Sequence, residues 1–189
     1  MIGSRGTVTT FLGLLFTCFL LCSVSSAQVA GGPAGAPAAP EKATNWTPPP
    51  TKIYAQSLSE QIMATHPELI SVTFHGVPPG LKEVYTMFAG SYPDRIGNPD
   101  DPDDVDVILK GITIVDPRWH RKNDPVKKFV VMLPLRDAAA ENVGLLVLAY
   151  KNDGSNAKGE KEFFLAATAL RDSLMSKIPT YAALFKPVP

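Results

Sequence analysis

The sequence predicts an α+β domain whose sheet is covered on both faces. Three observations support this fold class. Amphipathic helical patterns stand near the start and the end of the folded region, five strand-like segments lie between them, and the last two of these segments, 126–135 and 143–150, are apolar on both faces. A strand with two apolar faces belongs in the middle of a sheet that is covered on both sides.

The first helix is expected over residues 52–65. Thr51 can cap its start. Its apolar residues recur every fourth position and form one stripe: Tyr54, Leu58 and Ile62. Pro67 ends the helix, because the residue before a proline is driven out of the helical region.

The next segments predict a hairpin and a short helix. Strands 69–77 and 83–89 are joined by a turn of two prolines and a glycine, so we expect them to pair antiparallel. A helix is expected over 101–110, with Asp101 as its cap. Its first turn holds a proline and two carboxylates, which suit the positive end of a helix: Pro102, Asp103 and Asp104.

The second half of the chain predicts three strands and a final helix. The strands are expected at 112–115, 126–135 and 143–150, the last two joined by a turn at 137–142. The helix is expected over 160–177, where the apolar residues form a stripe for burial: Phe163, Ala167, Leu170, Leu174 and Ile178.

Residues 1–27 have the pattern of a secretory signal peptide. Arg5 precedes an apolar run over 11–21, and small residues lead to a cut after Ala27. We therefore expect a secreted or periplasmic protein, with no membrane span after cleavage. The alternative is an uncleaved N-terminal anchor. Both cysteines of the chain lie inside this segment.

The remaining chain predicts one domain between two flanking segments. Residues 28–51 are rich in proline, alanine and glycine, and are expected to form a disordered linker. Residues 52–178 are large enough for a single core. Residues 179–189, which begin with a proline, are expected to be a C-terminal tail.

The charge balance argues against non-specific binding to nucleic acid, and no nucleic-acid partner is expected. Eighteen basic and 18 acidic residues give a formal net charge of zero, and loss of Arg5 with the signal segment leaves −1. Binding to nucleic acid requires a concentrated basic surface, which this sequence lacks.

The element order, together with the export signal, resembles an extracytoplasmic PAS-like or single Cache-type sensor domain. The local sequence agrees in His66-Pro67-Glu68-Leu69, in Ile96-Gly97 before an acidic run, and in the strand Val131-Met132-Leu133-Pro134-Leu135. The resemblance covers about residues 51–178. It implies a five-stranded antiparallel sheet, flanked by the N- and C-terminal helices and roofed by residues 90–110 (the roof). It also implies a small-molecule pocket between sheet and roof.

Aromatic and charged side chains on the roof and the neighbouring strands are the candidates for that pocket. Arginine can hold a carboxylate through two hydrogen bonds, so the expected ligand is an amino acid or a small organic acid. Alternatively, Arg95 pairs with a loop aspartate and the aromatic residues close the core edge. The expected ligand-binding residues are Tyr85, Tyr92, Arg95, His75, Trp119, Arg136 and Asp137, with Asp94, His120 and Arg121 beside them.

No metal site, cofactor or catalytic site is expected. The acidic run over 100–106 lacks the glycine and glutamate of a calcium loop, and helix capping explains it. The three histidines have no metal-binding spacing. No nucleophile motif occurs. The sequence therefore favours a ligand-binding module without catalysis. The alternative is an interaction or scaffold domain that docks an envelope protein or a second copy of itself.

Overall fold

The computed structural model describes residues 43–189, apart from residue 124 and residues 155–156. The expected signal segment lies outside the described residues. Within them the chain forms a five-stranded antiparallel sheet in the order β2-β1-β5-β4-β3. The strands are β1 (Leu69–Gly76), β2 (Thr86–Gly90), β3 (Ile114–Val115), β4 (Lys128–Arg136) and β5 (Asn142–Lys151).

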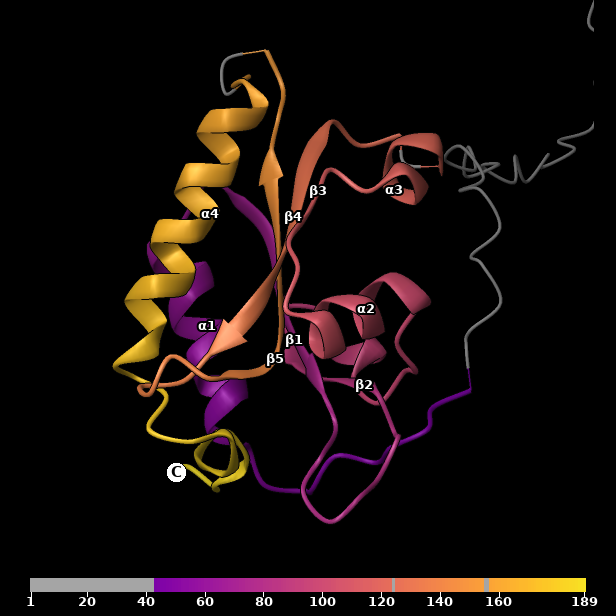
Figure 1. The fold of residues 1–189 in the computed structure, drawn as a ribbon, viewed down its shortest axis with the longest axis vertical. Helices are drawn as coiled ribbons and strands as arrows, with labels where there is room; N and C mark the ends of the chain where they lie inside the picture. Colours follow the sequence, from indigo (N-terminus) through magenta and orange to yellow (C-terminus); the bar gives the residue numbers. More distant parts are fainter. Residues whose placement is uncertain (1–42, 124, 155–156) are drawn as a thin grey trace, which may run out of the picture. The chain divides into compact units, whose positions relative to one another are not determined.

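Helices cover both faces of this sheet (Figure 1). They are α1 (Tyr54–Thr65), α2 (Pro102–Lys110), α3 (Arg118–Asn123), α4 (Glu160–Met175), and the 3-10 helices η1 (Pro93–Arg95) and η2 (Tyr181–Phe185). The predicted α+β class and the PAS-like arrangement of the sheet are confirmed. None of the helices in the described part of the chain has the length and apolarity that a membrane crossing requires.

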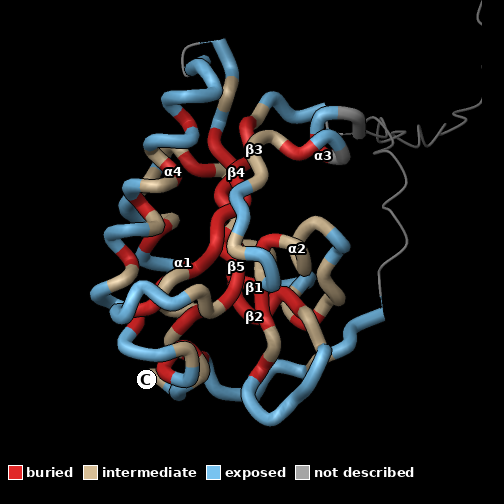
Figure 2. The backbone as a smooth tube through the Cα atoms, in the orientation of Figure 1, coloured by how far each residue is buried: buried red, intermediate tan, exposed pale blue. Residues whose placement is uncertain are grey.

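One face of the sheet packs against α1, α4 and η2. Phe74 and Leu146 are fully buried there, and the Phe129 and Phe163 rings stack with their centroids 4.6 Å apart. The predicted stripe of α4 is buried along its whole length, which confirms it: Phe163, Ala167, Leu170, Leu174 and Ile178. Figure 2 shows the buried central strands beside the largely exposed outer side of α4.

The other face of the sheet packs against α2. Val107 of α2 is fully buried against side chains from the two longest strands, which are Val130, Met132, Leu145 and Ala149. Their neighbours in sequence face the opposite core. The roof and the two apolar faces of the central strands are therefore both as predicted.

Helix α2 begins and ends as the sequence predicts. Asp101 is the N-cap, and Asp104 Oδ2 accepts a hydrogen bond from the Asp101 backbone N–H at 2.9 Å. The C-cap is Gly111, whose φ of 65° lies in the left-handed region that glycine tolerates best.

The start of α1 differs from the prediction. The N-cap is Ile53 rather than Thr51, and no side chain caps the helix. The Tyr54 backbone N–H instead donates to the carbonyl of Lys186 at 2.8 Å. The C-terminal segment therefore supplies an acceptor that local sequence could not indicate.

Other boundaries also differ. Strand β2 begins at Thr86 instead of residue 83, because Glu83 has a φ of 57°, which interrupts an extended strand. Strand β3 is shorter than predicted and covers only two residues. Helix α3 was not predicted at all.

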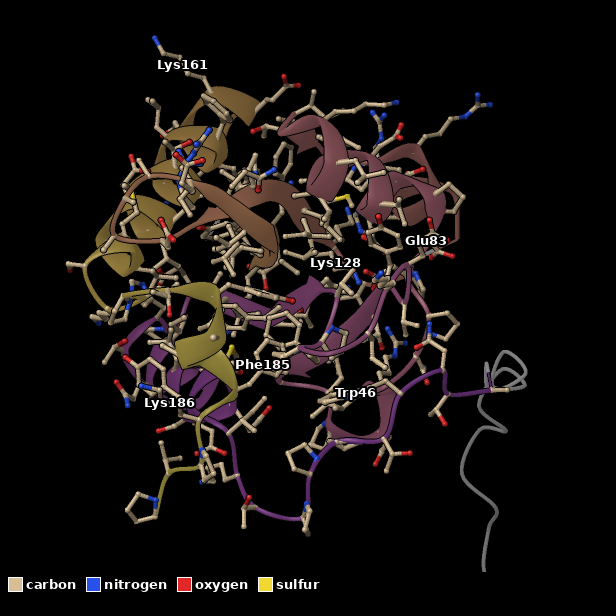
Figure 3. The ribbon with its side chains drawn as sticks, turned by 60° about the horizontal axis from the view of Figure 1, so that its bottom comes forward. Trp46, Glu83, Lys128, Lys161, Phe185 and Lys186 are labelled. Carbon is tan, nitrogen blue, oxygen red and sulfur yellow. The ribbon has the colours of Figure 1, made fainter. Side chains whose placement is uncertain are left out.

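Part of the expected linker belongs to the domain. The backbone N–H groups of Asn45 and Trp46 donate to the carbonyl of Gly97 at 2.8 and 3.3 Å. The Trp46 ring meets Phe185 edge-on at 6.3 Å, as Figure 3 shows. A Cβ on Gly97, whose φ is 92°, would collide with the carbonyl oxygen of Trp46. The prediction of a linker through residue 51 was therefore wrong from residue 45 onward.

The expected C-terminal tail also packs on the domain. Leu184 is fully buried, and the Tyr181 hydroxyl donates to the carbonyl of Val77 at 2.8 Å. Val188 N–H donates to the carbonyl of Lys52 at 2.9 Å. The chain therefore continues to pack on the domain after Pro179, which ends a helix without ending the fold.

Substitution of Leu184 tests whether this segment stabilises the domain. Because its side chain is fully buried, Leu184→Ala should lower the free energy of unfolding by about 2–5 kcal/mol. The control Leu165→Ala removes a side chain that is 53% exposed, and should change it by less than about 0.5 kcal/mol. Urea denaturation measures both, and equal effects would show that the segment is a loose tail.

Candidate functional site

A polar cluster lies between strand β1 and the start of α2. It consists of Thr73, His75, Asp100 and Asp104. His75 Nδ1 lies 2.7 Å from Asp100 Oδ1, and His75 Nε2 lies 2.7 Å from Thr73 Oγ1. One nitrogen or oxygen atom from each of His75, Asp100 and Asp104 lies within 4.8 Å of the others. The cluster therefore places two carboxylates around one imidazole beneath the roof.

The strand positions its two members by alternation. Thr73 and His75 are two residues apart on β1, so their side chains point to the same face of the sheet. Phe74 between them belongs to the core on the opposite face. On the face of the sheet that the roof covers, Thr73 and His75 therefore place polar side chains.

The roof positions Asp100 through an extra pairing with the edge of β2. Gly97 N–H donates to the carbonyl of Met87 at 2.8 Å, and Asp100 N–H donates to that of Tyr85 at 3.1 Å. These bonds return the chain to the sheet edge immediately before α2 begins. The Asp100 side chain is consequently only 1% exposed, and that of His75 is 11% exposed.

The carboxylates raise the pKa of His75. Burial by itself lowers this pKa, but the hydrogen bond that His75 donates to Asp100 and the charges of Asp100, Asp104 and Asp101 outweigh it. The protonated imidazole can then donate to both Asp100 and Thr73. Burial also raises the pKa of Asp104, against the opposing effects of the His75 charge and the hydrogen bond from the Asp101 N–H.

The second oxygen of Asp100 has no partner. Asp100 Oδ2 is buried, and no hydrogen-bond donor reaches it from the described residues. A buried acceptor left without a donor costs about 1–3 kcal/mol, and more when it is charged. Asp100 Oδ2 can therefore accept a hydrogen bond from a ligand or bind a cation.

Thr73, His75 and Asp100 follow the order hydroxyl, imidazole, carboxylate, which in hydrolases activates a nucleophile. Thr73, however, is 7% exposed and sits on a strand beneath α2. A nucleophile has to reach the substrate, and this hydroxyl is enclosed by the fold. The arrangement fits a structural or binding role better than nucleophilic catalysis.

Of the predicted site residues whose side chains the structure describes, only His75 joins this cluster through its side chain. Tyr85 contributes its backbone carbonyl, which accepts from Asp100 N–H. Arg95 is exposed, and its guanidinium lies 4.9 Å above the ring of Tyr92. Arg95 and Tyr92, which were both expected to bind the ligand, therefore contact each other.

Arg136 and Asp137 organise the turn between β4 and β5. Asp137 Oδ1 accepts hydrogen bonds from the N–H groups of Ala139 and Glu141 at 2.9 and 3.1 Å. Arg136 donates to the carbonyl of Ala140 at 2.7 Å. Both side chains therefore have partners within the turn itself.

The predicted basic and aromatic loop forms part of α3. His120 is buried and lies 3.3 Å from Asp116, which also pairs with the exposed Arg121 at 3.2 Å. The side chain of Trp119 lies outside the described residues. Asp94 is exposed in η1.

Two surface hollows lie away from the cluster. A hollow of about 280 Å³ is lined by His120, Arg121, Pro125, Val126, Lys127, Lys128 and Asn152. Another of about 240 Å³ is lined by the prolines at 48–50, Thr51, Lys52, Ile53, Gln56, Phe88 and Ile96. Neither includes His75, Asp100 or Asp104, and neither corresponds to a pocket between the sheet and α2.

Sequence reasoning missed Asp100 and Asp104 as site residues. Both were assigned to helix capping, which Asp104 does perform. The available signal was that the acidic run begins before the cap, so Asp100 was not needed for capping.

Comparison with solved structures finds a similarity to the sensor domain of DcuS from E. coli. The two chains are 15% identical, with a TM-score of 0.35, over 62% of this chain and 71% of the other. No family model matches the sequence, and neither does any curated protein. The PAS-like arrangement rests on the strand order and the covered sheet described above.

The raised pKa of His75 predicts how stability depends on pH. The folded protein holds this proton more tightly than the unfolded chain, whose histidine pKa is about 6.5. The resulting stabilisation is complete below that value and is lost as the pH rises through the folded pKa. NMR titration should find the His75 pKa above its ordinary value.

Asp100→Asn should bring the His75 pKa below its ordinary value, since burial then dominates. In His75→Gln, the free energy of unfolding should no longer decrease in this way as the pH rises above the ordinary histidine pKa. A His75 pKa at or below the ordinary value in the unaltered protein would contradict the buried ion pair.

Proposed function

We propose that the protein is an exported, non-catalytic PAS-like module that binds a small cationic ligand beneath its roof, at the polar cluster. The observation that carries the proposal is the Asp100 carboxylate, which is 1% exposed and has one buried oxygen without a partner. Among the five buried side-chain atoms of the described residues that have no hydrogen-bond partner, Asp100 Oδ2 is the one that belongs to a carboxylate, and a buried carboxylate oxygen without a partner is the most costly of them.

The charge of the cluster favours a cation over the organic acid that the sequence suggested. Two carboxylates and one histidine surround the site, whereas Arg95 lies outside on Tyr92. An anionic ligand would be repelled by Asp100 and Asp104, and no arginine is placed there to compensate. A metal ion or a compact amine meets two acceptors and has a favourable charge.

The packing of the roof also limits the size of the ligand. Val107 and its partners fill the space between α2 and the central strands. The ligand therefore has to fit at the margin of this core, beside β1, unless α2 moves. Small ions and small amines satisfy this restriction better than larger metabolites do.

A thermal-shift panel tests this function on the purified protein. The panel contains divalent metal chlorides, small amines, amino acids and dicarboxylic acids. A ligand that binds the folded state raises Tm according to its concentration and affinity. We expect cationic members to raise Tm, and Asp100→Asn to abolish the increase.

The matched control is Asp94→Asn, which removes an exposed carboxylate from the same roof segment. It should leave the shift unchanged, because Asp94 is not part of the cluster. If no member of the panel raises Tm, or if the effective members act equally on Asp100→Asn and the unaltered protein, the proposed function is wrong.

A further inference from the structure

We infer that the ligand of the polar cluster is a single divalent transition-metal ion, held by His75, Asp100 and Asp104. This inference rests on the proposed function and narrows it to one class of ligand. No metal site was expected, because the three ligands come from a strand, a loop and a helix and so have no recognisable spacing in the sequence.

The ligand atoms are already close to the separation that one ion requires. Around a zinc ion with bonds of about 2.1 Å, two ligand atoms can lie at most about 4.2 Å apart. One atom from each of the three side chains lies within 4.8 Å of the others. In a tetrahedral site the ligand atoms lie about 3.4 Å apart, so the cluster has to contract before all three atoms reach one ion.

The buried oxygen of Asp100 is the independent sign of a missing partner. Asp100 Oδ1 accepts from His75, while Oδ2 has no donor among the described residues. A cation between the imidazole and the two carboxylates would satisfy this oxygen. On binding, His75 would lose its Nδ1 proton to solvent, and the direct hydrogen bond from His75 to Asp100 would be replaced by one bond from each side chain to the metal.

Charge balance favours a dication. When His75 is neutral, the two carboxylates carry two negative charges, which a divalent ion neutralises completely. A buried charge is tolerated only when it is paired, so this balance removes the main cost of the cluster.

The hydrogen bond at Nε2 of His75 already orients the ring for metal binding through Nδ1. Nε2 lies 2.7 Å from Thr73 Oγ1, which can accept a hydrogen bond from the Nε2–H group. Metal-bound histidines usually donate their other N–H to such an acceptor, because the hydrogen bond fixes the tautomer and the ring orientation. Nδ1, which faces Asp100, is then available to the ion.

The donor set selects transition metals over magnesium and calcium. Imidazole suits Zn²⁺, Co²⁺, Ni²⁺ and Cu²⁺, whereas Mg²⁺ and Ca²⁺ are bound almost entirely by oxygen. The site offers one imidazole nitrogen and two carboxylates. Among divalent ions, zinc and cobalt are therefore the appropriate probes.

A bound ion would link the roof directly to the sheet. His75 belongs to β1, Asp104 to α2, and Asp100 to the loop between β2 and α2. The ion would thus add a polar link between elements that already meet through the apolar contacts of Val107 and Ile108 and through the hydrogen bond from Asn142 to the carbonyl of Ile108. Binding of the metal would therefore change the position or the stability of α2.

Titration of the metal-stripped, full-length protein with Zn²⁺ tests the inference. Calorimetry should show one ion per chain. Since loss of even an indirect partner lowers metal affinity about 10–100-fold, His75→Gln and Asp100→Asn should each weaken binding at least tenfold. In NMR spectra of the unaltered protein, Zn²⁺ should shift the His75 ring signals.

Two variants serve as matched controls. His66→Gln removes a histidine that pairs with Glu68 at 2.9 Å but is 34% exposed. Asp103→Asn removes the carboxylate next to Asp104 on α2. Both variants should bind Zn²⁺ with the affinity of the unaltered protein. As a separate measurement, Co²⁺ should give a visible absorption band with the unaltered protein, and this band should be absent from His75→Gln.

Each outcome decides between the two proposals. If Zn²⁺ and Co²⁺ do not bind, or if His66→Gln is the only variant that lowers the affinity for these ions, the metal inference is overturned. If a small amine then raises Tm in a manner that depends on Asp100, the cationic binding site remains. If neither metals nor amines bind, both proposals fail. Should Asp100→Asn not fold, Asp104→Asn and the His75 NMR signals of the unaltered protein give the answer.

Discussion

The architecture depends on the need to cover a sheet that is apolar on both faces. In β4, Val131 and Leu133 face α1 and α4, whereas Val130 and Met132 face α2. Exposure of either set to water would cost about 25 cal/mol per Å² of apolar surface. The chain between β2 and β3 is therefore obliged to return over the sheet, and α2 fulfils this requirement with Val107.

The roof is too short to cover the sheet with apolar residues alone. Helix α2 has nine residues, and only Val107 among them is fully buried. Beside it, β1 presents Thr73 and His75, and the loop before α2 presents Asp100. Apolar residues of similar volume in place of a buried ion pair are often neutral or stabilising by 1–4 kcal/mol. Stability alone therefore gives no reason for this cluster.

The fold could be predicted from sequence because its signals are local and agree with one another. The α4 stripe, the α2 capping box and the two-sided strands all depend on residues close together in the chain. The start of α1 and the C-terminal η2 could not be predicted in this way, because Tyr54 and Tyr181 bond to partners more than 100 residues away. The same limit applies to the site. His75 was identified as a candidate, but its partner Asp100 lies 25 residues further on, and sheet-edge pairing brings the two together.

The segments that sequence reasoning assigned to the linker and the tail contribute to the geometry of the site. Asn45 and Trp46 bond to Gly97, and Trp46 in turn packs against Phe185 of η2. Gly97 also bonds to β2, so the loop that carries Asp100 is held from two sides three residues before that carboxylate. A fixed loop brings Asp100 to His75 with little entropy left to lose on binding, which is the property of a preorganised site. Helix α2, by contrast, contacts the sheet through Val107, the partly buried Ile108 and the hydrogen bond from Asn142 Nδ2 to the carbonyl of Ile108, and only Val107 is fully buried. An ion at the cluster would therefore change the free energy of the α2 contact far more than that of the loop, which makes α2 the element through which binding would be transmitted.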